Sequence, residues 1–149
     1  MKRYMEIVEE VRRQIREVMP WDLAAEQEKN PGLLLLDVRE PYEFQVLRIA
    51  GSLNVPRGIV EQASEYGYDE TLPVLADARE QKVVVICRSG YRSVLVTQIM
   101  QWLGYQDVRS LRLGLRGWSD AELPLVDGLD QPLDPDEADR HFNPNQPEI

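Results

Sequence analysis

Residues that form covalent or metal cross-links are almost absent from this chain of 149 residues. It has one cysteine, Cys87, and one histidine, His141. An internal disulfide is therefore impossible, and a zinc site built from cysteine and histidine ligands is excluded. We expect neither a metal nor a cofactor, and Cys87 is the only thiol available for chemistry.

Long hydrophobic runs are also missing. The longest lie at residues 33–36 and 83–87, whereas a membrane-spanning helix needs about 20 apolar residues. Charged residues close to Met1 interrupt the apolar centre that a secretory signal peptide requires. These absences predict a cytoplasmic protein that does not enter a membrane.

Positive charge is scarce, and the shortage is uneven along the chain. The net charge is -9, and residues 120–149 carry most of it because nine acidic residues face one arginine there. An excess of acid argues against a nucleic-acid partner. The same stretch holds half of the ten prolines, and aliphatic residues become rare after Leu133. We interpret residues 122–149 as an extended, solvated, acidic tail.

The first 20 residues have the pattern of an amphipathic helix ended by Pro20. Apolar residues recur there at steps of four and three, at Tyr4, Val8, Val11, Ile15 and Val18. The stripe is short for a coiled coil, so it is expected to dock onto its own domain. A second helix is expected after Trp21, with Asp22 as its cap and residues 30–32 as its end.

Short apolar runs separated by helical stretches begin at residue 33. This alternation is typical of an open α/β fold, in which a parallel sheet is flanked by helices on both faces. The predicted strands are 33–37, 53–55, 83–87 and 108–110, and the predicted helices are 41–46, 59–79 with a break near Gly67, 92–103 and 113–120. We place one domain at 21–121, between the N-terminal helix (1–20) and the tail (122–149).

Cys87 stands at the carboxyl end of a predicted strand, where ligands of such sheets bind. Gly90 lets the following backbone turn so that N–H groups converge, and the next helix adds its positive end. These features favour a thiolate, so Cys87 is the predicted nucleophile. A cysteine after an apolar strand is often an ordinary core residue, but two arginines and a glycine within five residues have no obvious role there. The predicted binding loop comprises Arg88, Ser89, Gly90, Tyr91, Arg92 and Ser93.

Three motifs in this region resemble those of rhodanese domains, the sulfurtransferase family in which one cysteine carries a persulfide. They are Leu-Leu-Leu-Leu-Asp-Val-Arg-Glu-Pro at 33–41, Ile-Ala-Gly-Ser-Leu-Asn-Val-Pro at 49–56, and Val-Val-Val-Ile-Cys-Arg-Ser-Gly-Tyr-Arg-Ser at 83–93. Their order and spacing carry the resemblance, which covers residues 33–118.

The resemblance implies a two-step sulfur transfer. Cys87 would take the outer sulfur of thiosulfate or of a persulfide, and a thiophilic acceptor would then remove it. The expected partner is a small anionic sulfur donor that Arg88 and Arg92 attract and orient, with a protein donor or acceptor as the alternative.

Four other residues are candidates for supporting roles. Asp37 ends the first predicted strand and, with Arg39, is expected to brace neighbouring loops rather than act on a substrate. Arg48 stands where the resembled family usually has histidine, and it would either brace the fold or enlarge the positive field of the site. Trp118 would form a pocket wall or pack in the core.

Two other function classes stay open from the sequence. Cysteine phosphatases also pair a thiolate with an arginine, in a Cys-x5-Arg loop, but only four residues separate Cys87 from Arg92. That loop is short for surrounding a phosphate. The other class is a relay or regulatory module that passes sulfur between proteins, with residues 1–20 and 122–149 as contact surfaces.

Overall fold

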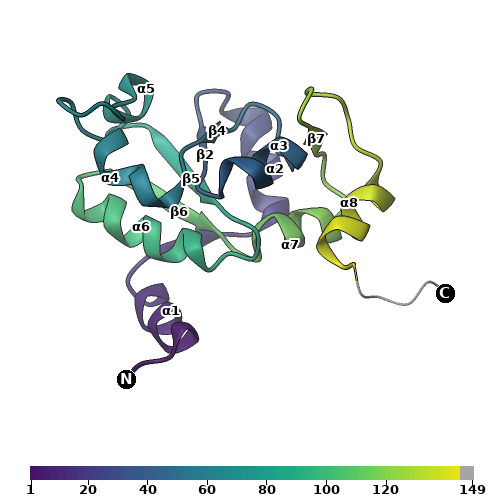
Figure 1. Cartoon of the computed structure of the whole chain (residues 1–149), viewed down its shortest axis with the longest axis horizontal. Coiled ribbons are helices and arrows are strands. Elements are labelled where there is room, and N and C mark those ends of the chain that lie inside the picture. Colours follow the sequence, from purple (N-terminus) through teal and green to yellow (C-terminus); the bar gives the residue numbers. More distant parts are fainter. Residues whose placement is uncertain (145–149) are drawn as a thin grey trace.

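The computed structural model describes residues 1–144 and has a five-stranded parallel sheet at its centre (Figure 1). The strand order is β1-β6-β5-β2-β4, and every neighbouring pair is parallel. The strands are β1 (Arg16–Val18), β2 (Leu34–Asp37), β4 (Leu53–Asn54), β5 (Lys82–Ile86) and β6 (Asp107–Leu111). Four of the five agree with the predicted strands to within one or two residues.

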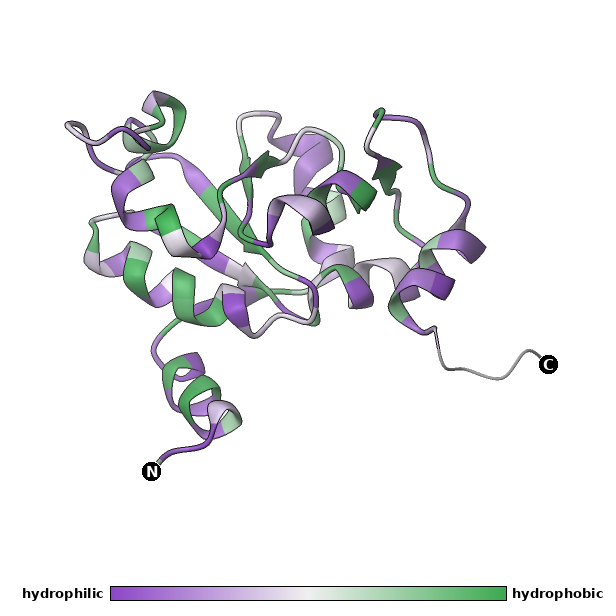
Figure 2. Ribbon diagram, viewed as in Figure 1, coloured by the Kyte–Doolittle hydropathy of each residue, from purple (hydrophilic) through white to green (hydrophobic). Residues whose placement is uncertain are grey.

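Helices cover both faces of this sheet, which confirms the predicted α/β class. Side chains alternate along β5, so that Val83 and Val85 face one core while Val84 and Ile86 face the other. The first core contains α4 (Val60–Ala63), α5 (Pro73–Ala76) and α6 (Arg92–Trp102). The second contains α2 (Pro20–Lys29), α7 (Gly114–Asp120) and α8 (Pro135–Phe142). The hydrophobic colouring of the central strands in Figure 2 reflects this burial on both sides.

Two predicted helices next to the sheet have different outcomes. Helix α3 (Pro41–Val46) has the predicted bounds. The helix predicted at 59–79 is much shorter than expected, whereas its predicted break near Gly67 is confirmed, because this stretch forms the 3-10 turn η1 (Arg57–Ile59) and the two short helices α4 and α5. Gly67, with φ of 99°, turns the chain between them, and Pro73 starts α5.

The predicted N-terminal helix over residues 1–20 is too long. Helix α1 spans Tyr4–Arg12, and residues 16–18 form the edge strand β1, in which Val18 pairs with Leu111 of β6. Pro20 does not end the first helix but begins α2, because its fixed φ and missing N–H suit the first helical turn. As expected, α1 docks onto its own domain, against α6.

The expectation of an extended, solvated tail is wrong for residues 122–142. Strand β7 (Val126–Asp127) pairs antiparallel with β3 (Leu47–Arg48). Helix α8 buries Ala138 and Phe142, which are four residues apart and therefore share one face, in the second core. Residues 145–149, also assigned to the tail, lie outside the described part of the chain.

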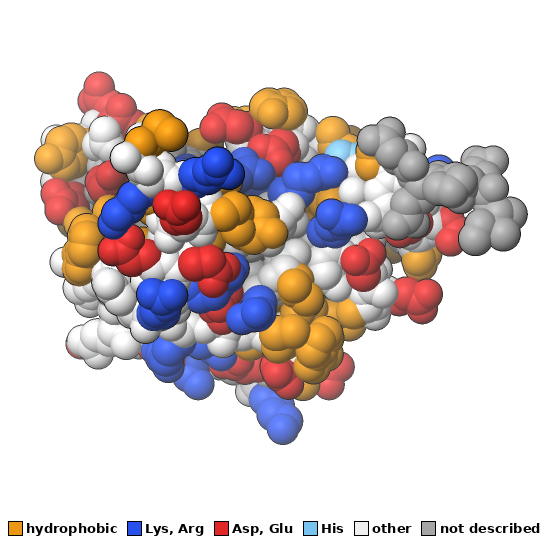
Figure 3. All heavy atoms as spheres, turned by 90° about the horizontal axis from the view of Figure 1, so that it is seen from below, with side chains coloured by type: hydrophobic (Ala, Val, Ile, Leu, Met, Phe, Trp, Pro, Cys, Tyr) orange, Lys and Arg blue, Asp and Glu red, His pale blue; other side chains and the backbone are white. Residues whose placement is uncertain are grey.

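Charges of both signs are mixed on the face shown in Figure 3, with hydrophobic side chains between them. This face is therefore not uniformly negative, although the net charge of the chain is -9. Among residues 1–144, no helix combines the length and the apolar composition that crossing a bilayer requires.

Candidate active site

Cys87 lies where the sequence places it, directly after β5 and before the loop that leads into α6. Its side chain is only 1% exposed. The surrounding residues therefore cover the sulfur almost completely. We refer to the loop of residues 87–91 and the first turn of α6 as the cradle.

Hydrogen-bond donors of the cradle converge on the Cys87 sulfur. The backbone N–H groups of Gly90 and Ser93 donate to Sγ over 3.2 and 3.4 Å. The thiol itself donates to the hydroxyl oxygen of Ser93 over 3.3 Å. Donors arranged in this way stabilise negative charge on the sulfur, because each points a positive dipole at it.

Ser110, which the sequence motifs did not indicate, extends this network from the neighbouring strand. Ser110 is paired with Val85 in the sheet, and its hydroxyl donates to Ser93 Oγ over 2.8 Å. Both serines are fully buried. When the sulfur is ionised, the Ser93 hydroxyl can donate to Sγ while it accepts from Ser110. The available sequence signal was the alternation along β6, which places Ser110 on the same buried side as Val108.

The backbone of the cradle is held from behind by the start of α7. The carbonyl groups of Cys87 and Arg88 accept from Leu115 N and Arg116 N over 2.9 and 3.0 Å. With its carbonyls engaged on this side, the loop can direct N–H groups toward the sulfur. A Cβ on Gly114 would lie 2.5 Å from the Arg88 oxygen, so the two backbones meet this closely only because residue 114 is glycine.

Arg92 is fixed at the cradle by a two-pronged ion pair with Glu43 of α3. Its two terminal nitrogens donate to the two carboxylate oxygens over 2.8 and 3.1 Å. Burial alone would raise the pKa of Glu43, but the hydrogen bonds and charge of Arg92 outweigh it, and this pKa lies below its ordinary value. Hydrogen bonding to Glu43 in turn raises the pKa of Arg92. Glu43 thus partly compensates the positive charge of Arg92. The sequence motifs did not predict a role for Glu43.

Arg88 points toward the C-terminal helix. Its guanidinium carbon lies 5.2 Å from the centre of the Phe142 ring, and one nitrogen is 3.5 Å from the Phe142 carbonyl oxygen. The two arginines that were predicted together therefore occupy different surroundings. Ser89 is half-buried in the loop between them.

Tyr4 of α1 brings an aromatic ring to the cradle. It meets Tyr91 edge to face, with ring centres 6.3 Å apart. Burial and the neighbouring charge of Cys87 raise the pKa of Tyr4, while Arg57 and Arg92 act in the opposite direction. The sequence stripe marked Tyr4 as a docking residue but did not indicate that it docks at the cradle.

Asp37 and Arg39 form a buried ion pair behind the site. Arg39 Nε and Nη2 donate to the Asp37 carboxylate over 3.0 and 2.9 Å, and Nη2 also donates to Leu47 O over 2.7 Å. The pair joins the end of β2 to the start of β3. This geometry agrees with the expected bracing role.

Arg48 and Trp118 are likewise engaged in the structure around the site. Arg48 donates to Phe44 O over 3.2 Å and to Asp130 Oδ1 over 3.0 Å, so it ties α3 to the turn after β7. Trp118 is buried in the second core and donates to Pro124 O over 2.8 Å. Both placements correspond to the structural alternatives considered for these residues.

The fold and the site together define a parallel α/β domain that presents one cysteine in a cradle of hydrogen-bond donors. Among known families, the rhodanese-like domain matches this chain over residues 20–121. The chain belongs to the rhodanese-like family, as the sequence motifs indicate.

Two curated proteins illustrate this relationship. A mitochondrial protein of Schizosaccharomyces pombe, whose name proposes a thiosulfate sulfurtransferase, is 34% identical over 103 residues, which are 67% of this chain and 72% of that protein. An adenylyltransferase and sulfurtransferase of Drosophila virilis is 34% identical over 92 residues, 61% of this chain but only 20% of that longer protein.

A solved structure supports the fold. A protein of unknown function from Rhodopseudomonas palustris, suggested to be a tyrosine phosphatase, superposes with a TM-score of 0.74 at 24% identity. The similarity covers 83% of this chain and 94% of that one. It therefore extends beyond the residues matched by the family.

Proposed function

We propose that this protein is a sulfurtransferase that moves sulfane sulfur from thiosulfate or a persulfide donor, through a Cys87 persulfide, to a thiophilic acceptor. The observation that carries the proposal is the convergence of the Gly90 and Ser93 N–H groups on the one thiol of the chain. Relatives named as sulfurtransferases support the same type of reaction.

In the first step, the Cys87 thiolate attacks the outer sulfur of thiosulfate. A bond forms between Sγ and that sulfur, and the S–S bond of thiosulfate breaks. Sulfite leaves with the electron pair, so that Cys87 carries a persulfide anion. The cradle N–H groups stabilise the thiolate before this step and the persulfide after it.

In the second step, the acceptor attacks the outer sulfur of the persulfide. With cyanide as acceptor, a carbon–sulfur bond forms and thiocyanate leaves, while the electron pair of the broken S–S bond returns to Cys87 as a thiolate. No general base is assigned in this sequence, because the attacking species is the thiolate form of Cys87.

The test compares wild-type protein with Cys87→Ser. After exposure to thiosulfate, wild-type protein should gain the mass of one sulfur atom and then convert cyanide to thiocyanate. The serine variant should keep its fold, measured by circular dichroism, and do neither. Thiocyanate production by Cys87→Ser would refute the proposal.

A relay between proteins is the second candidate function, favoured by the similarity, at 29% identity over 93 residues, to a Bacillus subtilis protein whose name proposes a sulfur carrier. It requires Cys87 to load sulfur while turnover with cyanide stays negligible. A phosphatase is disfavoured because Glu43 already occupies both terminal nitrogens of Arg92. We therefore expect no hydrolysis of aryl phosphates by the wild-type protein.

A further inference from the structure

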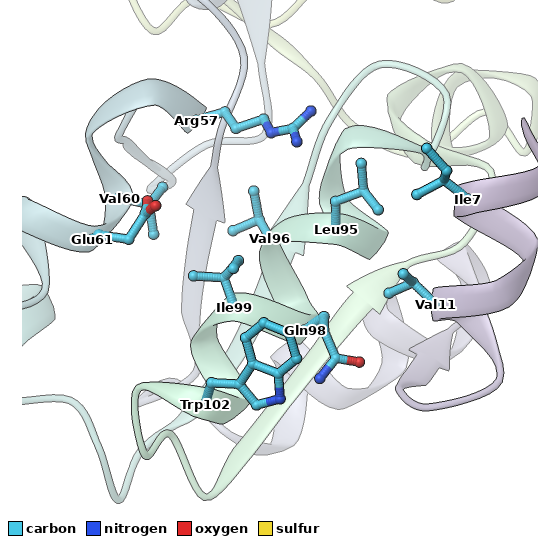
Figure 4. A pocket seen from close by; sticks show the side chains of 10 residues that line it. All are labelled: Ile7, Val11, Arg57, Val60, Glu61, Leu95, Val96, Gln98, Ile99 and Trp102. Carbon is cyan, nitrogen blue, oxygen red and sulfur yellow. The ribbon is translucent and has the colours of Figure 1, made fainter. Parts of the chain in front are cut away.

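A groove of about 340 Å³ lies on the surface between α1, α6 and the segment from η1 to α4. Its apolar lining includes Ile7, Val11, Val60, Leu95, Ile99 and Trp102. Figure 4 shows the α6 side chains between those of α1 on one side and those of residues 57–61 on the other. This volume lies within the usual range for small-molecule sites.

The groove and the cradle share helices α1 and α6. At the cradle, Tyr4 of α1 meets Tyr91, the residue before α6. Ile7 follows Tyr4 by three residues on α1, and Leu95 follows Tyr91 by four residues at the start of α6. Residues at these spacings lie on the same side of a helix, one turn further along. A molecule whose reacting atom is at the cradle can therefore extend its remaining atoms into the groove.

Three polar side chains interrupt the apolar lining. Gln98 is only 7% exposed, and its Oε1 is buried without a hydrogen-bond partner among the described residues. Such an acceptor is normally satisfied, so this atom favours a ligand that supplies an N–H or O–H donor. Arg57 adds a positive charge near Tyr4, where it opposes the rise in the pKa of that residue, and Glu61 adds a carboxylate.

We propose, on the basis of the proposed sulfur transfer, that the groove binds the organic body of the sulfur acceptor. The sulfur transfer requires a thiophilic group, here a thiol, and the lining favours a carboxylate close to its sulfur, an amide N–H and an apolar chain. The carboxylate pairs with Arg57, the N–H meets Gln98, and the chain covers Leu95, Ile99 and Trp102. N-acylated cysteines have this arrangement and serve as probes.

The transfer to such an acceptor balances without a further reactant. The thiol sulfur attacks the outer sulfur of the Cys87 persulfide, and a new S–S bond forms between them. The bond between Sγ and the outer sulfur breaks, and its electron pair stays on Cys87 as a thiolate. The proton of the acceptor thiol ends on the transferred sulfur, so the product is the persulfide of the acceptor.

The test uses protein whose Cys87 carries one sulfur and a series of N-acetyl-, N-butanoyl-, N-hexanoyl- and N-octanoylcysteine. The reacting group is the same throughout, and only the chain grows. The half-saturating acceptor concentration should fall by about two- to fourfold for each added methylene that the groove buries. Loss of the transferred sulfur is followed by intact-protein mass spectrometry.

Two variants locate the effect. Trp102→Ala should abolish the gain between the hexanoyl and octanoyl compounds, whereas Trp21→Ala, which removes another exposed tryptophan from α2, should not. Arg57→Met should remove the preference for the free acid over its methyl ester. Loading from thiosulfate should be unchanged in Trp102→Ala and Trp21→Ala, because thiosulfate has no chain to bury.

Calorimetry with the unreactive S-methyl ethers of the same series tests the groove independently of sulfur chemistry. Affinity that rises with chain length and is lost in Trp102→Ala supports the groove, even if Cys87 never loads sulfur, in which case only the proposed function fails. Normal loading with no dependence on chain length in either transfer or binding overturns the groove and leaves the proposed function intact.

Discussion

The two ends of the described chain, α1 and α8, touch the same cradle in different ways. Both lie outside residues 20–121, which the family matches. Phe142 of α8 is 3% exposed and lies against Arg88, whereas Tyr4 of α1 is 50% exposed and lies against Tyr91. The C-terminal helix completes a core, while the N-terminal helix borders a groove. Helices α1 and α8 therefore have different structural roles, although both contact the cradle.

The largest expected effect tests the packing of α8. Phe142→Ala removes a ring from the second core and should lower the free energy of unfolding by about 3–5 kcal/mol. Leu129→Ala, at an exposed position after β7, should change it by less than about 0.5 kcal/mol. Urea denaturation measures both. Equal stability of Phe142→Ala and wild type would show that α8 is not part of the core.

Deletion of residues 1–12 should cost less stability than Phe142→Ala. Val8 is the one buried residue of α1, and the loss of its burial corresponds to about 2 kcal/mol. The shortened protein keeps β1 and should still load sulfur from thiosulfate. Urea denaturation and mass spectrometry check the two parts. A stability loss as large as that of Phe142→Ala would make the two ends equivalent.

Ser110→Ala tests a hydrogen bond near the Cys87 sulfur that involves neither α1 nor α8. It removes the donor to Ser93 and should slow transfer about fivefold, as expected for a hydrogen bond of about 1 kcal/mol. The control is Ser64→Ala, which also removes a buried serine hydroxyl, one that donates to Val60 O over 2.7 Å. Steady-state turnover and urea denaturation are compared. If both variants lose similar stability and similar activity, Ser110 has no particular role at the cradle.

The smallest expected effect is a pH dependence in α8. Burial, with the charges of Arg88 and Arg39, holds the pKa of His141 below its ordinary value. The unfolded chain then binds this proton more readily than the folded chain does, so the free energy of unfolding should fall as the pH drops below about 6.5. His141→Gln should remove that part of the dependence between pH 7.5 and 5.5. An unchanged pH dependence in His141→Gln would show that other titratable groups cause it.

Local sequence patterns predicted the central part of the fold well. The apolar runs that became β2 and β5 are each continuous, and Gly90 marks the turn into α6. The acidic composition of residues 122–149 led to the prediction of a solvated tail. The sequence also contains a helix start signal there, because Asp134 can cap a helix whose first residue is Pro135. The helix buries two apolar side chains, Ala138 and Phe142, in the second core.

The candidate site was predicted only as far as it is contiguous in sequence. Cys87 and its loop follow from one strand end, and the placement of Gly90 and Ser93 near the sulfur agrees with that expectation. Ser110, Glu43 and Tyr4 reach the cradle from other elements. Their contacts depend on strand order and helix docking, which a single sequence does not specify.

The backbone contact between the cradle and α7 has a consequence for how such proteins diverge. The position of the loop depends on Gly90, Gly114 and main-chain hydrogen bonds rather than on the side chains of Arg88, Ser89 and Tyr91. Homologues can therefore replace these outer side chains, and so change their preferred partners, without changing the backbone that surrounds the Cys87 sulfur. For protein engineering, this separates residues that set specificity from residues that must be left unchanged.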